Sequence, residues 1–385
     1  MARLDNTLKG DKYVWGLIIF LYLSGILVVY SATGTLAYQK FDGNTEHYLF
    51  KHISNVLLSL AAVWFCHRID YRYYSRLSRI ALLISVPLLL ITWKFGVNIN
   101  EASRWITIPL INQSFQPSDL AHLALVTSIA SMLSKRQGNV DDFQNTVLPV
   151  LIWTGIICTL IGLSDASGAI LLFCISLLLL FIGRVPVGQI MLLVLVGFIS
   201  LTLSLYLGQR MQTFEGRLEK FMDDTETPFQ AEQSFIAIST GGLIGKGPGN
   251  SDQRNFLPNP YSDFIYAIIV EEYGLLGGLI VLGGYLLLLY RGVVVVASSS
   301  QPFGGILSAG LTFSVVVQAL VNMAVAVGLV PITGLPLPLL SMGGTSLLFT
   351  GISLGIILSV SRGAIDPDID KKRTENAART RPTVS

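Results

Sequence analysis

The sequence has little charge. Only 13% of its 385 residues are Asp, Glu, Lys or Arg, against roughly a quarter in soluble domains, whereas 52% are apolar. The net charge of +2 gives no electrostatic reason to expect a nucleic-acid partner. The apolar runs are long and do not alternate with polar residues, and the mean hydropathy is +0.62. These features predict membrane-spanning helices and argue against a β-barrel.

Cysteine is also scarce. Cys66, Cys158 and Cys174 lie in or beside apolar runs, and no two of them have the spacing of a redox motif or a metal site. We interpret them as small core residues. The first apolar run lacks a small-residue cleavage site, so we expect a retained span and not a signal peptide.

Ten apolar segments approach or exceed the ~20 residues that a helix needs to cross the hydrocarbon core. They cover residues 13–31, 52–67, 80–97, 117–133, 147–163, 168–183, 186–207, 264–290, 304–329 and 342–361. The sequence therefore predicts an all-α polytopic membrane protein with about ten transmembrane helices in one membrane domain, residues 13–362. Residues 1–12 and 363–385 flank it, and we expect the polar tail to be disordered.

Lys and Arg residues predict the orientation of the spans. When ten spans are threaded, most of these residues gather on one side, including those before the first span and in the tail. The opposite short loops carry only Lys40, Lys51, Lys94 and Arg104. Both termini are therefore expected in the cytoplasm, and the one large loop, 208–263, is expected outside.

The glycine-rich stretch TGGLIGKGPGNS, residues 240–251, lies in this outer loop. It departs from the nucleotide-binding pattern G-x-x-x-x-G-K-[ST], because Thr240 replaces the first glycine and Gly247 follows Lys246. Two interpretations remain. The stretch is a tight turn, or the N–H groups of Gly245 and Gly247 bind an anion together with Lys246.

Ionisable residues within or beside spans are costly and usually face a cavity or a partner. Asp263 opens the eighth span, where it is either an N-cap or a general base with a raised pKa. Asp119 and His122 lie three residues apart at the outer end of the fourth span, on one helix face. They are part of a helix start, FQPSD, or they form a local ion pair, or they accept hydrogen bonds from other helices.

Two glutamates lie deeper in the eighth span. Glu271 falls on a face neighbouring that of Asp263 and could share one cavity with it, whereas Glu272 points away. Gln318 and Asn322, one turn apart in the ninth span, are candidate partners for these glutamates. A structural clamp and a functional role both remain open.

A phosphate ligand is expected among the outer basic residues. Arg104 either anchors the chain at the interface or offers its guanidinium to a phosphate. Lys246 and Arg254 are alternatives, as are Arg210 and Arg217.

The stretch GLVPITGLPLPLLSMGGTS, residues 328–346, is rich in proline and glycine. Irregular backbone at membrane depth is tolerated only where protein or water covers it, so we expect this stretch to fold back and line a cavity. Ser341 within it is a candidate substrate ligand.

Four motifs in order resemble one family. NEASRWI…FQPSD, EQSFIAISTGGLIGKGPGNS, LPNPYSDFIYAIIVEEYGLLGG and GLVPITGLPLPLLSMGGTS are similar to the motifs of the SEDS proteins (shape, elongation, division and sporulation). The resemblance covers about residues 13–362. It implies a ten-span bacterial membrane protein that polymerises glycan strands from lipid II. NFLPNPYSDFIYA and the chain length resemble the division members more than the elongation members.

The resemblance also implies residue roles. Asp263 falls on the catalytic aspartate of the family. Residues 116–119 match its QPSE motif with Asp119 as the acid, and His122 stands where a lysine is usual. A histidine would bind phosphate only when protonated. LSDASGA keeps Asp165 of a QPDxGTA motif but has lost its Gln and Pro, which suggests a structural role.

The implied reaction joins two lipid-linked substrates. Asp263 takes the proton of the GlcNAc 4-hydroxyl of incoming lipid II, which attacks the growing strand with inversion, and undecaprenyl pyrophosphate leaves. Arg104, Lys246 or Arg254, or a divalent cation such as Mg²⁺ or Mn²⁺, would balance its charge. The residues themselves indicate no metal site.

The resemblance further implies partners and a location. The partners are a class B penicillin-binding transpeptidase and other division proteins. The location is the bacterial inner membrane at the division septum.

Two other functions remain open, a transporter that flips lipid II and a non-catalytic scaffold of a division complex. Ten spans and the irregular stretch suit alternating access. The acidic residues nevertheless cluster near the outer face, and no inverted repeat is visible, which favours the polymerase.

Overall fold

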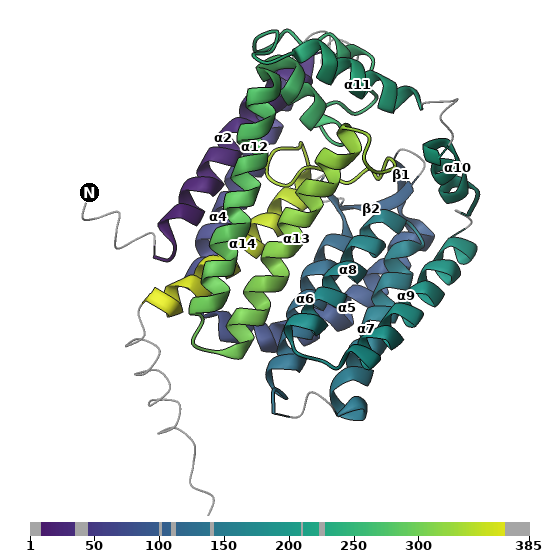
Figure 1. The fold of residues 1–385 in the computed structure, drawn as a ribbon, viewed down its shortest axis with the longest axis vertical. Coiled ribbons are helices and arrows are strands. Elements are labelled where there is room, and N and C mark those ends of the chain that lie inside the picture. Colours follow the sequence, from purple (N-terminus) through teal and green to yellow (C-terminus); the bar gives the residue numbers. More distant parts are fainter. Residues whose placement is uncertain are drawn as a thin grey trace, which may run out of the picture.

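Ten long helices run side by side in the computed structural model (Figure 1), which describes residues 9–34, 45–99, 102–108, 113–138, 142–208, 211–222 and 228–365. They are α2 (Lys12–Ala32), α4 (Thr45–Arg68), α5 (Tyr74–Phe95), α6 (Pro117–Ser134), α7 (Leu148–Gly162), α8 (Ala166–Ile182), α9 (Val187–Leu207), α12 (Ile265–Ser298), α13 (Pro302–Ala326) and α14 (Gly344–Ile365). Each predicted apolar segment overlaps one of them. Residues 1–8, the predicted disordered tail from 366 onward and Arg210 lie outside the described residues.

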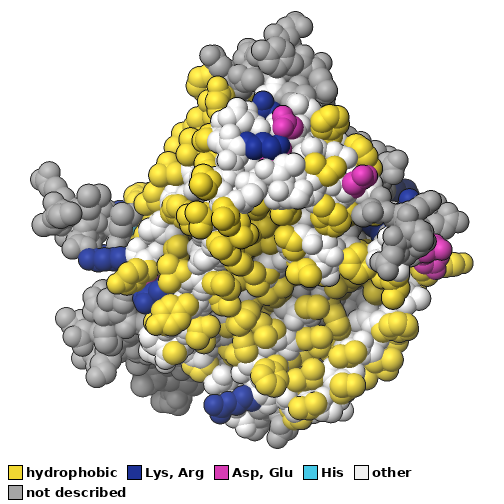
Figure 2. Space-filling view, turned by 45° about the horizontal axis from the view of Figure 1, so that its top comes forward, with side chains coloured by type: hydrophobic (Ala, Val, Ile, Leu, Met, Phe, Trp, Pro, Cys, Tyr) yellow, Lys and Arg dark blue, Asp and Glu magenta, His cyan; other side chains and the backbone are white. Residues whose placement is uncertain are grey.

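Eight of the ten helices are long and apolar enough to cross a membrane, and the exceptions are α6 and α8. Helix α8 is apolar but has only 17 residues, and α6 carries Asp119 and His122 near its start. Hydrophobic side chains cover most of the face in Figure 2, as a lipid-facing surface requires. The prediction of a mostly helical, membrane-spanning chain is therefore confirmed.

The outer connections are more structured than the sequence suggested. The segment between α9 and α12 contains α10 (Met211–Met222), α11 (Phe229–Gly241) and the short helix η3 (Gln253–Asn255). On the inner side, η1 (Tyr71–Tyr73) precedes α5 and the π-helix η2 (Phe143–Val147) precedes α7.

A small sheet, which the sequence did not predict, joins α5 to α6. Its strands are β1 (Val97–Ile99), β2 (Ala102–Ile108) and β3 (Gln113–Phe115), antiparallel in the order β1-β2-β3. Val97 pairs with Trp105, and Ile106 pairs with Phe115. Arg104 therefore stands on the central strand.

Helix α14 packs closely on α4 because small residues face the contact. A Cβ atom on Gly355 would lie 2.8 Å from the carbonyl oxygen of Val63, and one on Gly351 would lie 2.8 Å from that of Ser59. Small residues four positions apart allow helix backbones to approach this closely in membranes. The glycines of α14 therefore let this helix lie against the backbone of α4.

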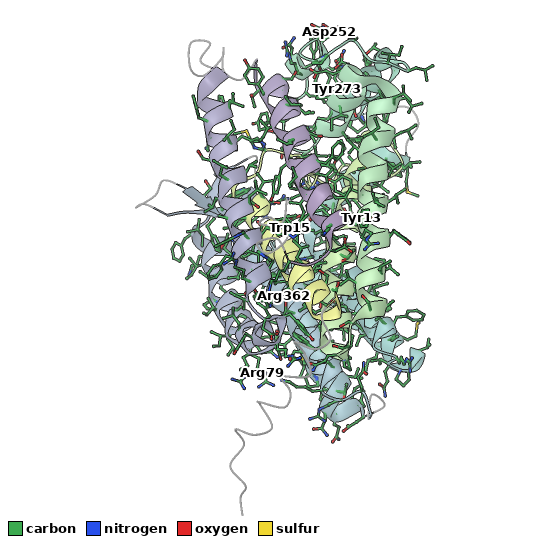
Figure 3. All side chains as sticks on the ribbon, turned by 90° about the vertical axis from the view of Figure 1, so that its left-hand side faces the viewer. Tyr13, Trp15, Arg79, Asp252, Tyr273 and Arg362 are labelled. Atoms are coloured by element: carbon green, nitrogen blue, oxygen red, sulfur yellow. The ribbon has the colours of Figure 1, made fainter. Side chains whose placement is uncertain are left out.

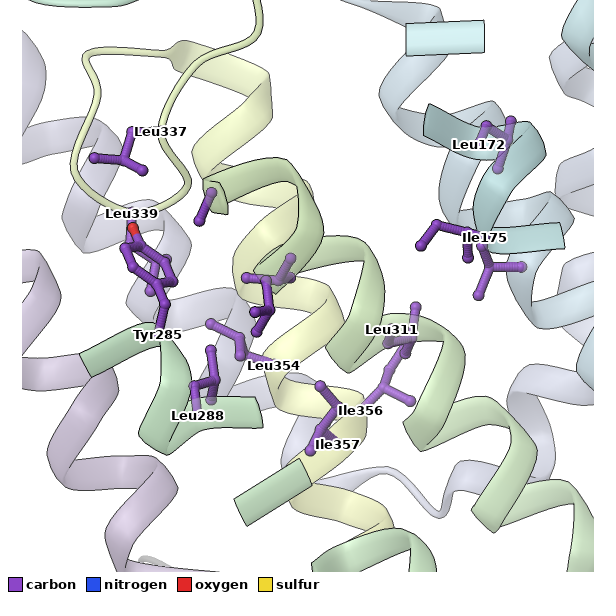
Figure 4. Close-up of a cluster of buried hydrophobic side chains, with 14 of the residues drawn as sticks. Leu172, Ile175, Tyr285, Leu288, Leu311, Leu337, Leu339, Leu354, Ile356 and Ile357 are labelled. Atoms are coloured by element: carbon purple, nitrogen blue, oxygen red, sulfur yellow. The ribbon is translucent and has the colours of Figure 1, made fainter. Parts of the chain in front are cut away.

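The stretch between α13 and α14 folds back among the helices, as predicted. Leu337 and Leu339 are buried, and the Tyr285 hydroxyl of α12 donates to the carbonyl oxygen of Pro338 (Figure 4). The irregular backbone is therefore covered by protein, as the bilayer requires.

Residues at the two ends of the bundle show which helix ends lie on the same side. Arg79 and Asp252 lie at opposite ends of the molecule, and both are exposed (Figure 3). The backbone N–H of Asp11, before α2, donates to the Ser361 hydroxyl of α14 at 3.0 Å. The start of α2 and the end of α14 thus share one side, consistent with the predicted orientation.

Labelling tests this orientation. We expect Asp252→Cys to react with a membrane-impermeant maleimide added outside the cell, and Arg79→Cys to react only after permeabilisation, because basic residues stay inside. The unsubstituted chain gives the background from Cys66, Cys158 and Cys174. Labelling of position 79 from outside would contradict the orientation.

Candidate active site

A partly open cavity of about 880 Å³ lies among the helices, towards the side that the sequence predicts to be outside. Among the predicted site residues that line it are Arg104, Asp119, His122 and Asp263. They come from β2, from the first turns of α6 and from the residues just before α12. Asp165, at the start of α8, also faces this cavity.

Asp263 does not cap the helix that follows it. Phe264 occupies the N-cap position of α12, and no side chain makes a capping hydrogen bond there. The N-cap interpretation is therefore wrong. The carboxylate Oδ1 of Asp263 instead accepts a hydrogen bond from the Ser262 hydroxyl at 2.9 Å. Since the carboxylate does not hold the helix end, it is available to a substrate in the cavity.

Side chains from α13 and the irregular stretch hold the backbone at Asp263. The Asn322 amide donates to the carbonyl oxygens of Asp263 and Leu335, each at 2.8 Å. The Ser341 hydroxyl donates to the Ser262 carbonyl oxygen at 2.6 Å. Ser341 does not line the cavity, so the structure gives it a positioning role in place of the predicted substrate contact.

Burial raises the pKa of Asp263 above its usual range. The Ser262 hydrogen bond and the charges of Arg104 and Arg217 lower this pKa, and Asp165 raises it further. Burial outweighs the lowering contributions. A raised pKa makes an ionised carboxylate a stronger base.

Arg104 lies at the edge of the cavity in a constrained position. Its Nε donates to the Ser164 carbonyl oxygen at 3.0 Å, and its Nη1 lies 3.5 Å from Oδ2 of Asp165. Asp165 also accepts from the N–H of Gly168 at 3.1 Å and caps α8. Asp165 therefore has structural contacts, and Arg104 remains partly exposed. The phosphate contact of Arg104 stays a prediction.

Arg217 of α10 is a second cation at this cavity. Its Nη1 donates to the Ile332 carbonyl oxygen at 3.3 Å. Arg217 and Arg104 also border a smaller cavity of about 310 Å³, whose other lining residues are mainly apolar, such as Ile170 and Val321. The sequence indicated Arg217 only as one alternative phosphate ligand.

Asp119 and His122 face the cavity without pairing with each other. The Thr345 hydroxyl of α14 donates to Oδ2 of Asp119 at 3.1 Å, which ties α6 to α14. His122 Nε2 is buried and has no hydrogen-bond partner in the described part of the chain. The local ion pair is therefore not formed among the described residues, whereas the alternative of acceptance from another helix is confirmed for Asp119.

Comparison with known proteins decides the family. The family model for FtsW, RodA and SpoVE, described as "Cell cycle protein", matches residues 11–365. The chain belongs to this family. The match covers both the cavity and the motifs on which the resemblance rests.

Relatives of this family span nearly the whole chain. A protein of Geobacter metallireducens named "Probable peptidoglycan glycosyltransferase FtsW" is 34% identical, over 92% of this chain and 95% of its own. Stage V sporulation protein E of Bacillus subtilis is 30% identical, over 89% and 94%. The first name agrees with the activity that the resemblance implies.

Solved structures show the same fold. A chain from "a peptidoglycan synthase complex" matches with a TM-score of 0.71 and 25% identity, over 92% of this chain and 98% of its own. Thermus thermophilus RodA matches with a TM-score of 0.66 and 24% identity, over 93% and 99%.

Glu271 lies outside the cavity. It is fully buried, and its carboxylate accepts from Lys246 Nζ at 2.7 Å, from the Ser251 hydroxyl at 2.5 Å and from the N–H of Asp252 at 3.0 Å. The prediction that it shares a cavity with Asp263 is wrong, because its helix face turns to the glycine-rich loop. The Lys246 ammonium group is bonded within the same network, and Lys246 does not line the cavity.

The glycine-rich loop packs against the backbone of α12. That helix is interrupted at Gly274, which has a positive φ of 70°. The N–H of Gly247 donates to the Glu272 carbonyl oxygen at 3.0 Å, and that of Gly245 donates to Gly241 at 2.9 Å. A Cβ on Gly245 would lie 2.3 Å from the Glu272 carbonyl oxygen, so only glycine fits. These N–H groups are used within the protein, which supports the tight turn over an anion site.

Arg254 and Glu272 tie α2 to the outer end of α12. Arg254 Nη1 donates to the Ser31 carbonyl oxygen at 3.1 Å, and the Ser31 hydroxyl donates to Oε1 of Glu272. Arg254 therefore has a structural contact in place of the predicted substrate contact. The proposed partnership of the glutamates with Gln318 and Asn322 is wrong, because those amides bind the irregular stretch.

One face of α4 lines the cavity and was missed as a site. It consists of Tyr48, Lys51 and Asn55. Their spacing of three and four residues places them on one side of a helix, a signal that the sequence contained. Lys51 had been used only to predict orientation.

The described ranges contain no group of three or more His, Cys, Asp or Glu side chains that could hold a metal ion. Arg104 and Arg217 supply positive charge at the cavity. A divalent cation stays a prediction, and we assign no step to it.

The Lys246–Glu271 pair generates a stability prediction. Lys246→Met leaves the buried Glu271 carboxylate without its cation and should lower the free energy of unfolding by about 1–3 kcal/mol. Asp252→Asn is the matched control, because Lys246 also contacts this exposed carboxylate and the change should have little effect. Thermal unfolding in detergent measures both, and equal melting temperatures would contradict the assignment.

Proposed function

We propose that this chain is a peptidoglycan glycosyltransferase that polymerises lipid II on the outer side of the membrane, with Asp263 as general base. The observation that carries the proposal is an uncommitted carboxylate with a raised pKa, facing a large outer cavity beside two arginines. The names of the relatives and the family motifs support the same activity.

The base acts on the acceptor. The 4-hydroxyl of the GlcNAc of lipid II transfers its proton to the Asp263 carboxylate as its oxygen attacks the anomeric carbon of the donor. The bond from that carbon to the diphosphate breaks, and the configuration inverts. Asn322 and Ser341 hold the backbone of Asp263, so the carboxylate needs no large rearrangement to reach the hydroxyl.

The leaving group is an undecaprenyl diphosphate, whose negative charge grows as the bond breaks. Arg104 and Arg217 border the cavity and lower the pKa of Asp263, which places their charges within electrostatic reach of the reacting centre. Fixed guanidinium groups stabilise developing phosphate charge at little reorganisation cost.

The location of the cavity suits substrates with lipid anchors. Both substrates keep their polyprenyl chains in the bilayer and their sugars outside, so the site must border the outer headgroup layer. We place the protein at the bacterial inner membrane and at the division septum, as the resemblance to division members implies.

A cross-linking transpeptidase is the proposed partner. The similar structure comes from a complex whose description couples polymerization and crosslinking. A new strand needs both reactions, so the two activities belong together.

Replacement of the base tests the mechanism. Asp263→Asn keeps the side-chain shape and removes the proton acceptor, so strand synthesis from labelled lipid II in proteoliposomes should fall about 10²–10⁴-fold. Asp252→Asn, another carboxylate on the outer side, should keep its rate. Unchanged melting temperature and partner binding would exclude misfolding.

Different outcomes separate the alternatives. Full-rate synthesis by Asp263→Asn would refute the base assignment. Movement of monomeric lipid II across the bilayer by the wild type, with no polymer, would favour a transporter.

The raised pKa of Asp263 predicts a pH dependence. The carboxylate must be ionised to act as a base, so the rate should fall as the pH drops through a value above the ~3.9 of an exposed aspartate. Arg217→Gln removes a charge that lowers this pKa, so the acid limb of the rate profile should move to higher pH. Arg217→Lys should leave the limb near its original position. An unmoved limb in Arg217→Gln would contradict this electrostatic coupling.

A further inference from the structure

The main cavity has positive charge at two separate places. Arg104 and Arg217 border it from β2 and α10, and Lys51 borders it from α4. Figure 1 shows α4 and α10 on opposite sides of the bundle. Residues of both helices line the cavity, with Lys51 on α4 and Arg217 on α10.

The Lys51 end has the features of a polar binding surface. Tyr48, Lys51 and Asn55 share one face of α4 and all line the cavity. Lys51 is exposed, and no ion pair or hydrogen bond of its ammonium group occurs with the described residues. The Asn55 side chain is 5% exposed and faces the cavity from the next turn.

The arginine end differs in two ways. Arg104 and Arg217 act electrostatically on Asp263, whereas Lys51 is not among the groups that shift its pKa. Both arginines, but not Lys51, also border the smaller apolar cavity. This end therefore combines nearness to the base with space for an apolar chain.

The chemistry of the two substrates differs in the same way. In the donor, the diphosphate is attached to the carbon that reacts, so it must lie next to the base. In the acceptor, the reacting 4-hydroxyl is at one end of the disaccharide and the diphosphate is at the other. The acceptor diphosphate must therefore bind a full disaccharide away from the base.

We propose that Lys51, with Asn55 beside it, binds the diphosphate of the lipid-linked acceptor, and that Arg104 and Arg217 bind the diphosphate of the donor. This assignment rests on the proposed function and divides its single cavity into two subsites. The strand then grows by moving its new diphosphate from the lysine end to the arginine end after each addition.

Two acceptors separate these subsites. The donor is lipid II without the 4-hydroxyl of its GlcNAc, which can donate but cannot accept. One acceptor is ordinary lipid II. The other is the lipid-free disaccharide pentapeptide with a free 1-hydroxyl, which lacks the diphosphate. The measured quantity is the ratio of coupling efficiencies (kcat/KM) with the lipid-linked and the lipid-free acceptor.

Lys51→Met should lower this ratio about 10- to 100-fold, because only the lipid-linked acceptor loses a charge-assisted phosphate contact. Lys51→Arg should restore most of the ratio. Arg104→Met should lower coupling with both acceptors and leave the ratio near that of the wild type, since both reactions use the same donor.

The outcomes are distinguishable. An unchanged ratio in Lys51→Met, with or without a loss of overall rate, would overturn the acceptor assignment and leave the proposed function intact. If the wild type couples the donor to neither of the two acceptors, the proposed function is overturned, and this assignment with it. Lys51 is exposed, so its replacement should not impair folding, and thermal unfolding of the variant checks this.

Discussion

A piece of irregular backbone enclosed by helices is the constraint on which the site depends. Carbonyl groups removed from water need hydrogen-bond donors, and a missing donor costs several kcal/mol in an apolar environment. Gln318, Asn322 and Tyr285 provide donors to the stretch between α13 and α14. Asn322 also donates to the Asp263 carbonyl oxygen. The same amide that satisfies the irregular backbone therefore also holds the backbone of the candidate base.

Two acidic residues near the start of α12 have different surroundings, one open to the cavity and one bonded within the protein. Just before the helix, Asp263 faces the cavity, and within the described part of the chain its carboxylate accepts one hydrogen bond, from the Ser262 hydroxyl. Two turns later, Glu271 is fully buried and bonded to the glycine-rich loop. The network around Glu271 supports the backbone next to the interruption at Gly274. It therefore stabilises α12, the helix that begins just after Asp263. An acid used for structure has all its partners within the protein, whereas an acid used for chemistry must keep a face open.

The cavity suits a reaction between two similar substrates used in different ways. Both carry a lipid and a diphosphate, but only one reacts at the carbon that bears it. The cations are distributed unevenly, because Arg104 and Arg217 act electrostatically on Asp263 whereas Lys51 borders the cavity from α4, and this matches the difference.

The sequence by itself predicted the ten helices and the family, and it singled out Asp263 as the candidate base and an orientation for the spans. Hydropathy, basic residues and contiguous motifs are local properties, and the bilayer leaves a long apolar run few alternatives to a helix. Only the tertiary structure decided which polar residues share a cavity. Glu271 and Asp263 are close along the chain but face different surroundings, whereas Lys51 reaches the cavity from a helix about 200 residues away. Side-chain surroundings depend on how helices pack, and that packing is set by contacts between distant segments that no local pattern encodes.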